Sequence, residues 1–256
     1  MSVATARMVG RRWVVKQAGR GVLGFAVLGL AACSDGGPSD SAARRPGETS
    51  PTATSSGKGG ASLTWSRVDL GFVAAYVLVR GHEVAVVDTG VGGSAGAIAA
   101  VLDDVGAGWA GVRHVILTHK HPDHAGSIGD VLDAAEAATG YIGAEDLREV
   151  DAPRPLQAVQ DGDEVFGLQV VGTPGHTAGH VAVFDPTMRL LVAGDALTND
   201  GRLAGSNPQF TEDAAAAADS VGKLAELAPR TILVGHGPPV VEDAAAMLSQ
   251  LATSVG

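Results

Sequence analysis

Short apolar runs separated by glycines fill the chain after about residue 62, and their spacing alternates between strand-like and helix-like. Runs rich in β-branched or aromatic residues predict strands. In the first half these strands are expected at 63–68, 72–79, 83–87 and 112–117. Apolar residues at helical spacing predict one helix at 94–105, which Gly106 is placed to end, and another at 127–138.

The second half of the chain repeats this order of strands and helices. Its strands are expected at 165–171, 181–184, 190–192 and 231–234. An alanine-rich helix is expected at 211–227, with Thr211 as its N-cap, and a last helix at about 240–251. Two halves that each combine strands with helices predict an α/β protein, α+β in some schemes, with sheets inside and helices outside. The spacing alone leaves the topology open.

The amino-acid composition indicates a folded, acidic domain. Hydrophobic residues make up 45% of the 256 residues, which excludes a largely disordered protein. The chain has 18 basic and 28 acidic residues, and five of the basic ones lie before position 33, where there is no acid. A mature surface this acidic repels phosphate backbones, so we expect no nucleic-acid partner. The single cysteine, Cys33, excludes an internal disulfide and a cysteine-ligated metal cluster.

The first 32 residues have the layout of a signal peptide. A basic segment containing Arg11 and Arg12 precedes an apolar run at 21–32. This run of about 12 residues is shorter than the roughly 20 that a membrane-spanning helix needs. The arginine pair, with Lys16 after three apolar residues, resembles a twin-arginine export signal. An ordinary basic signal region is the alternative.

The end of this segment, Leu30 to Cys33, resembles a bacterial lipoprotein box, in which the cysteine is lipidated and becomes the mature N-terminus. Ordinary cleavage beside an incidental cysteine is the alternative. Residues 33–61 are rich in Ser, Thr, Pro and Gly without apolar periodicity, which predicts a flexible tether. We therefore predict a domain at 62–256 that is exported and held by a lipid on Cys33 at the extracytoplasmic face of a bacterial membrane.

Three histidines and an aspartate lie within six consecutive positions directly after the run at 112–117: His119, His121, Asp123 and His124. Imidazole nitrogens and carboxylate oxygens are ligands for Zn²⁺ and its neighbours in the transition series. Further residues of these types follow other expected strands, namely Asp88, His176, Asp195 and His236. A solvated histidine-rich turn is the alternative interpretation, and the further ligands argue against it.

These residues, in this order, resemble the metallo-β-lactamase-fold hydrolase superfamily over residues 62–256. The resemblance rests on the His119 to His124 motif, on His176 after Thr-Pro-Gly, and on Asp195 and His236, each of which follows a glycine. It implies a four-layered αβ/βα sandwich with metals at the sheet edges between the two halves. It also implies that the chain is a metallo-hydrolase.

The resemblance assigns the ligands to two divalent metal ions, with zinc expected and iron or manganese as alternatives. One ion would be held by His119, His121 and His176, the other by Asp123, His124 and His236, and Asp195 would bridge the two. A bridging acid argues against the true β-lactamases, which resemble this pattern in part but lack that acid.

Such a pair of ions predicts hydrolysis of a small-molecule substrate, an ester, thioester or lactone, by a metal-bound hydroxide. We expect Asp123 to be both a ligand and the catalytic residue that orients this hydroxide or accepts its proton. Asp88 and His180 are expected to support the ligands through hydrogen bonds. Lys120, between two ligands, is a candidate for attracting anionic substrates. The sequence predicts no oligomeric state.

Two other functions are compatible with the sequence. One is a mononuclear iron enzyme that resembles the sulfur dioxygenases, which use only the positions of His119, His176 and Asp195. The other is a lipid-anchored metal-binding protein without turnover. Two zinc equivalents favour hydrolysis, whereas one iron with oxygen uptake on a persulfide favours the dioxygenase.

Overall fold

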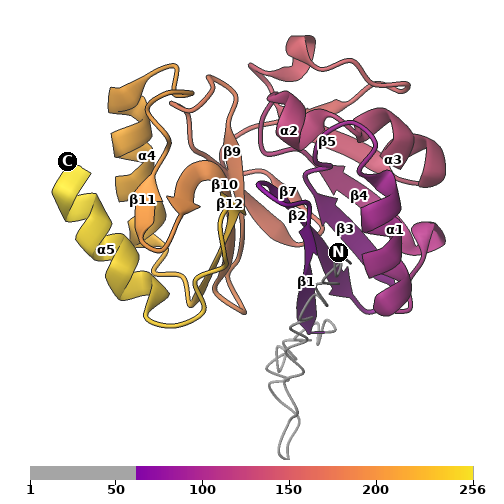
Figure 1. Ribbon diagram of the computed structural model, residues 1–256, viewed down its shortest axis with the longest axis horizontal. Helices are drawn as coiled ribbons and strands as arrows, with labels where there is room; N and C mark the ends of the chain where they lie inside the picture. The colour runs from indigo at the N-terminus through magenta and orange to yellow at the C-terminus, as the bar shows by residue number, and fades with distance from the viewer. Residues whose placement is uncertain (1–61, 256) are drawn as a thin grey trace, which may run out of the picture. The chain divides into compact units, whose positions relative to one another are not determined.

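The computed structural model describes residues 62–255, which form an α/β domain (Figure 1). The predicted signal peptide, the lipoprotein box at Cys33 and the tether lie outside the described residues. Within 62–255, no helix combines the length and the apolar character that crossing a bilayer requires.

The first sheet contains six strands arranged in chain order. They are β1 (Leu63–Asp69), β2 (Ala74–Arg80), β3 (Glu83–Val87), β4 (Val112–Ile116), β5 (Thr139–Gly143) and β6 (Gln157–Val159). Strands β1 to β3 pair antiparallel, and β3 to β6 pair parallel. The helices of this half are α1 (Ala95–Asp104), α2 (Pro122–Ala125) and α3 (Ile128–Ala134), with 3-10 turns η1 (Trp109–Gly111) and η2 (Leu147–Glu149).

The second sheet is built from the rest of the chain. Its strands are β7 (Glu164–Val165), β8 (Leu168–Gly172), β9 (Val181–Asp185), β10 (Leu190–Asn199), β11 (Leu203–Gly205) and β12 (Thr231–His236). They follow the order β11-β10-β9-β8-β7, and β12 pairs parallel with β10. Its helices are α4 (Ala214–Glu226) and α5 (Ala244–Val255).

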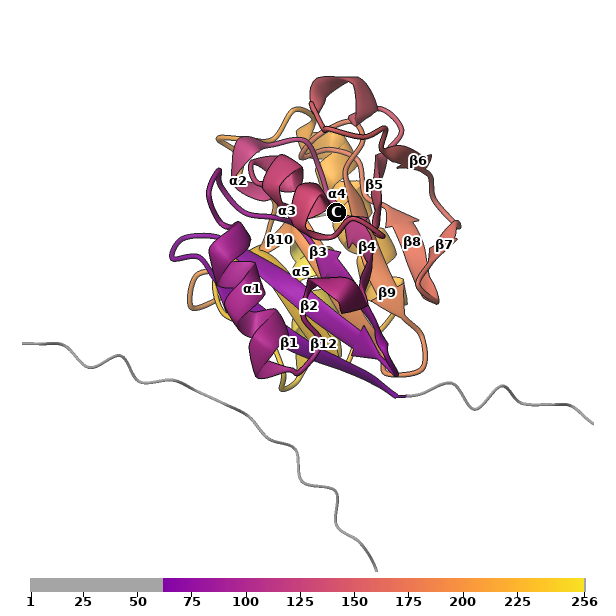
Figure 2. The ribbon, with the colours of Figure 1, turned by 90° about the vertical axis from the view of Figure 1, so that its right-hand side faces the viewer.

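The domain has four layers, because each sheet buries both of its faces. In β2, Ala75 and Val77 pack under α1 and α3, whereas the alternate residues Tyr76 and Leu78 pack against the second sheet. The outer face of the second sheet packs against α4 and α5. Figure 1 shows α1 and α3 on one side of the domain and α4 and α5 on the other. Figure 2 shows α1 and α3 lying over the first sheet. The predicted αβ/βα sandwich is thus confirmed.

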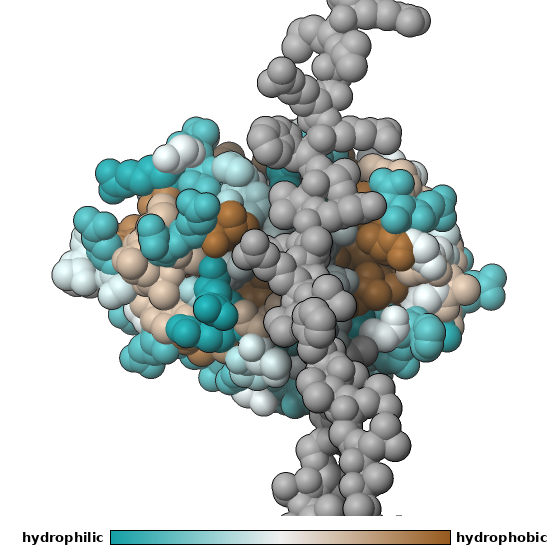
Figure 3. All heavy atoms as spheres, turned by 90° about the horizontal axis from the view of Figure 1, so that it is seen from below, coloured by the Kyte–Doolittle hydropathy of each residue, from teal (hydrophilic) through white to brown (hydrophobic). Residues whose placement is uncertain are grey.

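The surface of this domain is mixed rather than uniformly polar. The face seen from below in Figure 3 carries hydrophilic side chains with apolar ones between them. Phe72 and Phe210 are among the large apolar residues that stay exposed, at 64% and 57% of their surface. Both belong to loops rather than to strands or helices.

Two helix starts differ from the sequence predictions. The helix predicted at 211–227 begins at Ala214, because Asp213 is its N-cap and accepts hydrogen bonds from two backbone amides of the first turn. Thr211 instead bonds to groups of the preceding loop. The last helix begins at Ala244, later than predicted.

Strand β10 is longer than the run at 190–192 that predicted it. It continues to Asn199 because β11 and β12 pair with it beyond irregularities in its register. The helix predicted at 127–138 ends at Ala134, and the chain enters β5 from there. Pairing with β11 and β12 sets the length of β10, and apolar spacing alone does not reveal it.

An ion pair joins the two sheets. Arg80 at the end of β2 contacts Asp185 at the end of β9, with 2.5 Å between Nη2 and Oδ2. The Arg80 guanidinium also donates to the Phe166 carbonyl between β7 and β8, and it lies 5.2 Å from the centroid of the Phe166 ring. Asp185 is buried, and Arg80 is the cation that faces its carboxylate.

We expect Arg80→Ala to lower the free energy of unfolding by about 3 kcal/mol, because it leaves a buried carboxylate without its cation. Urea unfolding followed by circular dichroism would measure the change. Arg113 is the matched control, since its exposed side chain bonds only to the Ala110 carbonyl among the described residues. If Arg80→Ala cost no more than Arg113→Ala, the ion pair would contribute nothing to stability.

Candidate metal centre

The segment that follows β4, made of a loop and the short helix α2, carries four of the predicted ligands. Pro122 opens α2, where a proline fits because its missing N–H would have no partner inside the helix. This short helix contains Asp123 and His124, while His119 and His121 precede it. His119 and His124 are fully buried, whereas His121 and Asp123 are partly exposed. The site is therefore closed towards the core and open on the side of Asp123.

The other three predicted ligands come from the second sheet. His176 lies in the loop between β8 and β9, Asp195 lies within β10, and His236 ends β12. His176 and Asp195 are buried, and the His236 side chain is 29% exposed. Each sheet therefore contributes side chains to the same place.

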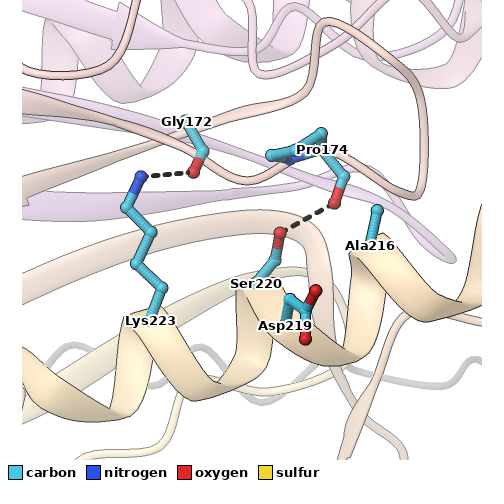
Figure 4. A pocket seen from close by; sticks show the side chains of 6 residues that line it. All are labelled: Gly172, Pro174, Ala216, Asp219, Ser220 and Lys223. Atoms are coloured by element: carbon cyan, nitrogen blue, oxygen red, sulfur yellow. Dashed lines mark hydrogen bonds between the residues drawn. The ribbon is translucent and has the colours of Figure 1, made fainter.

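Helix α4 supports the start of the loop that carries His176 (Figure 4). The Ser220 hydroxyl donates to the Pro174 carbonyl at 2.7 Å, and the Lys223 ammonium donates to the Gly172 carbonyl at 2.9 Å. These bonds fix the backbone where it leaves β8. The turn that follows carries His176.

The seven side chains converge in three overlapping groups. Within each group the ligand atoms lie within 4.8 Å of one another: His119, His121 and His176; His119, His124 and Asp195; Asp123, His124 and His236. The Asp195 carboxylate lies between the outer groups. Its Oδ2 is 3.4 Å from His176 Nε2 and 3.2 Å from His236 Nε2, and its Oδ1 is 3.2 Å from His124 Nε2.

Asp88 orients two of these histidines. Its Oδ2 lies 2.8 Å from His124 Nδ1 and accepts from the Thr118 hydroxyl at 2.9 Å, and that hydroxyl lies 3.0 Å from His119 Nδ1. Its Oδ1 accepts from the Thr118 N–H. A neutral imidazole has a single N–H, so these contacts leave the Nε2 lone pairs of His119 and His124 facing the centre.

Two loop residues, Ser206 and Phe72, orient His176 and His236. The Ser206 hydroxyl lies 2.8 Å from His176 Nδ1, and the Phe72 carbonyl accepts from His236 Nδ1 at 2.7 Å. The Phe72 ring also stacks on His236, with 6.1 Å between ring centroids. The Nε2 lone pairs of these histidines consequently face the centre as well.

The inner atoms repel one another unless a cation lies between them. His121 Nδ1 is 3.0 Å from His119 Nε2 and 2.9 Å from His176 Nε2, and a single N–H cannot serve both lone pairs. Asp195 Oδ1 is buried and has no hydrogen-bond partner among residues 62–255, although it lies 3.2 Å from His124 Nε2. Imidazole nitrogens with carboxylates suit zinc, iron or manganese. The residues therefore fit a pair of metal ions.

The charges at the centre also favour bound cations. Hydrogen bonds that His236 donates to the carboxylates of Asp123 and Asp195 raise its pKa to about 10. Burial acts to lower the pKa of His124, but the carboxylates of Asp195 and Asp88 outweigh it and hold this pKa well above its ordinary value. Without a metal ion, protons on His124 and His236 therefore balance the charge of the carboxylates. Metal binding would displace those protons.

His180 holds the backbone of Asp195. Burial lowers the pKa of His180 to about 3, so the ring is neutral. Its Nε2 accepts from the Asp195 N–H at 3.1 Å, which places the ring proton on Nδ1, 2.7 Å from the Thr173 hydroxyl. Both ring nitrogens are therefore engaged away from the inner ligand atoms.

Thr118, Ser206 and Phe72 orient histidines of the centre but were not predicted from the sequence. Thr118 stands directly before His119, so a hydroxyl beside a metal motif was an available signal. Ser206 and Phe72 come from loops far away in the chain, where nothing in the local pattern points to a histidine. Their contacts depend on how the two sheets pack together.

Lys120, which the sequence suggested as a candidate for attracting anionic substrates, is paired with two glutamates. Its ammonium lies 2.6 Å from Glu149 Oε1 and 2.9 Å from Glu212 Oε1. The hydrogen bond with Glu149, assisted by Glu212, raises the pKa of the lysine. Two carboxylates therefore compensate its charge, and little of it is left to attract an anionic substrate.

Known proteins resemble this chain in both sequence and fold. A probable metallo-hydrolase from Bacillus subtilis, YflN, is 31% identical in an alignment of 205 residues that covers 62% of this chain and 77% of the relative. A hydroxyacylglutathione hydrolase from Pseudomonas syringae is 34% identical in an alignment of 130 residues that covers 46% of this chain and 45% of that enzyme. The crystal structure of a metallo-beta-lactamase family protein from Thermus thermophilus covers 75% of this chain and 78% of its own, with a TM-score of 0.61 and 26% identity.

The model of the metallo-beta-lactamase superfamily matches residues 68–236, from the end of β1 to the last predicted ligand. This span includes both sheets, except most of β1, and all seven side chains of the centre. The chain belongs to the metallo-β-lactamase superfamily, and it is an enzyme of the metallo-hydrolase class.

Proposed function

We propose that this protein is a hydrolase that uses two divalent metal ions, with zinc the expected metal, to cleave small esters, thioesters or lactones. The observation that carries the proposal is the position of Asp195, whose carboxylate contacts histidines of both outer groups. A carboxylate with a buried oxygen that lacks a hydrogen bond among the described residues suits a bridge between two cations. The relatives named as hydrolases support the reaction class.

In this proposal each sheet contributes to both metal sites. The first ion would be held by His119, His121 and His176, the second by Asp123, His124 and His236, and Asp195 would serve both. When bound, the two ions would polarise the scissile carbonyl and make water reactive at neutral pH. The rest of the chemistry falls to side chains of the chain.

Asp123 is the residue best placed to handle the proton. Its side chain is 28% exposed, and its Oδ2 lies 3.3 Å from His236 Nε2 and 3.7 Å from His124 Nε2. Hydrolysis adds a hydroxyl to the acyl carbon and a proton to the leaving oxygen or sulfur. Asp123 would accept the proton from the attacking water and pass it to the leaving atom. Substrate would approach on this side, where Asp123 and His236 are exposed.

The proposal is tested by assaying the purified full-length chain against activated esters, thioesters and lactones. Chelator-treated protein should show no turnover above background, and added zinc should restore it. Iron and manganese, added separately, show which ion supports turnover best. If the metal-loaded protein hydrolysed none of the three classes, the proposal would be wrong.

A further inference from the structure

A fully buried carboxylate outside the ligand set lies next to the centre. Asp146 follows β5 and stands at the start of η2, but its side chain bonds to two other loops. Its Oδ2 accepts from the Lys120 N–H at 3.1 Å and from the Thr177 hydroxyl at 2.6 Å. Its Oδ1 accepts from the Gly179 N–H at 2.9 Å. A charged group with no exposure is retained only where such partners compensate its burial.

The partners of Asp146 belong to the two loops that carry one group of histidines. Lys120 lies between His119 and His121, and Thr177 directly follows His176. The first loop leaves β4 of the first sheet, and the second connects β8 and β9 of the second sheet. One carboxylate therefore ties together the two backbones whose separation sets the distances among these three imidazoles.

The backbone around Asp146 is packed for this contact. A Cβ atom on Gly143 would lie 1.8 Å from the Gly179 carbonyl oxygen, and one on Gly179 would lie 2.4 Å from the Asp146 nitrogen. Only glycines allow so close an approach. The loop after β5 is thus pressed against the loop that carries His176.

The other group of ligands is held by different contacts. Asp88 bonds to His124, and the Phe72 carbonyl bonds to His236. Asp123 lies in α2 and faces those two histidines. Within residues 62–255, Asp146 makes no hydrogen bond to any of these three ligands or to the residues that orient them.

We propose that Asp146 is a positioning residue for the first metal site alone, the site of His119, His121 and His176. The inference rests on the proposed two-metal function. We call the hydrogen bonds of Asp146 to Lys120, Thr177 and Gly179 the clamp. Without the clamp the two loops can move apart, so the three imidazoles no longer point at one metal position. The second site keeps its geometry. Removing a group that positions metal ligands through hydrogen bonds typically lowers metal affinity by about 10- to 100-fold.

The test is a zinc titration of the metal-free full chain, in competition with a chromophoric chelator, and a cobalt titration followed by visible absorption. Wild type should bind two ions. Asp146→Asn should bind one ion with wild-type affinity and the other about 10- to 100-fold more weakly. The cobalt spectrum should keep the bands of one site and lose those of the other. Thr177→Val removes a single bond of the clamp and should weaken the same step by a smaller factor.

Asp185→Asn is the matched control. Asp185 is also a buried carboxylate, and it accepts from Arg80 and from the Met188 N–H, away from the loops of the centre. This variant should lose thermal stability and still bind both ions as wild type does.

Three results would overturn the inference: unchanged binding in Asp146→Asn and Thr177→Val, equal weakening of both ions, or the same loss in Asp185→Asn. Wild type that binds no second ion would instead contradict the proposed function itself. The two failures are therefore distinguishable.

Discussion

Asp123→Ala is expected to lower kcat/KM for hydrolysis of the proposed ester, thioester or lactone substrates by about 10²- to 10⁴-fold, the usual contribution of a positioned acid–base group. The carboxylate stands on the open side of the centre, with Oδ2 3.3 Å from His236 Nε2. Its pKa lies below the ordinary value: burial acts against this, but His236 and His124 outweigh it. The group is therefore ionised at neutral pH and ready to accept a proton.

The experiment compares Asp123→Ala with wild type and with Asp133→Ala under identical metal loading. Asp133 is an exposed acid on α3 and has no recorded contact with the centre in the described part of the chain, so its removal should leave kcat/KM unchanged. Metal content should be measured on each sample, because Asp123 is also a proposed ligand. Unchanged hydrolysis in Asp123→Ala would remove this residue from the mechanism.

Asp195→Asn is expected to weaken both metal sites together, by at least about 100-fold, since losing a shared ligand costs more than losing a group that supports one. The carboxylate contacts His124, His176 and His236 at 3.2 to 3.4 Å. An amide has nearly the same shape but no negative charge to share between two cations. Burial opposes the ionised form of Asp195, yet His124 and its neighbours hold its pKa well below the ordinary value, so the native group is charged.

Isothermal titration with zinc would measure this loss, and activity should fall with it. The pattern differs from that of Asp146→Asn, which is expected to affect one ion only. If Asp195→Asn kept one ion at wild-type affinity, Asp195 would belong to a single site. A bridging role would then be excluded.

The residues of the candidate centre are easier to pick out from the sequence than the bounds of the strands and helices around them. His119, His176, Asp195 and His236 each follow an apolar run and are chemically conspicuous, so they could be read without knowing the topology. The structure places all of them around one point. The family and the layered fold followed from that set, and both are confirmed.

Residues that act through long-range packing were beyond the reach of the sequence. Ser206, Phe72 and Asp146 lie in loops whose local composition is ordinary, and their role comes from contacts with segments 26 or more positions away. The misplaced cap of α4 has a local cause instead. Thr211 and Asp213 are both good caps, and only the bonds of Thr211 to its own loop decide between them.

The central claim is that two metal ions share Asp195 and support hydrolysis. Elemental analysis of the purified protein, combined with assays of ester hydrolysis and of oxygen uptake on a persulfide, tests it most directly. We expect two equivalents of a divalent metal per chain, with zinc the expected metal. Hydrolysis should be abolished by a chelator. A single equivalent of iron with oxygen uptake and no hydrolysis would contradict it.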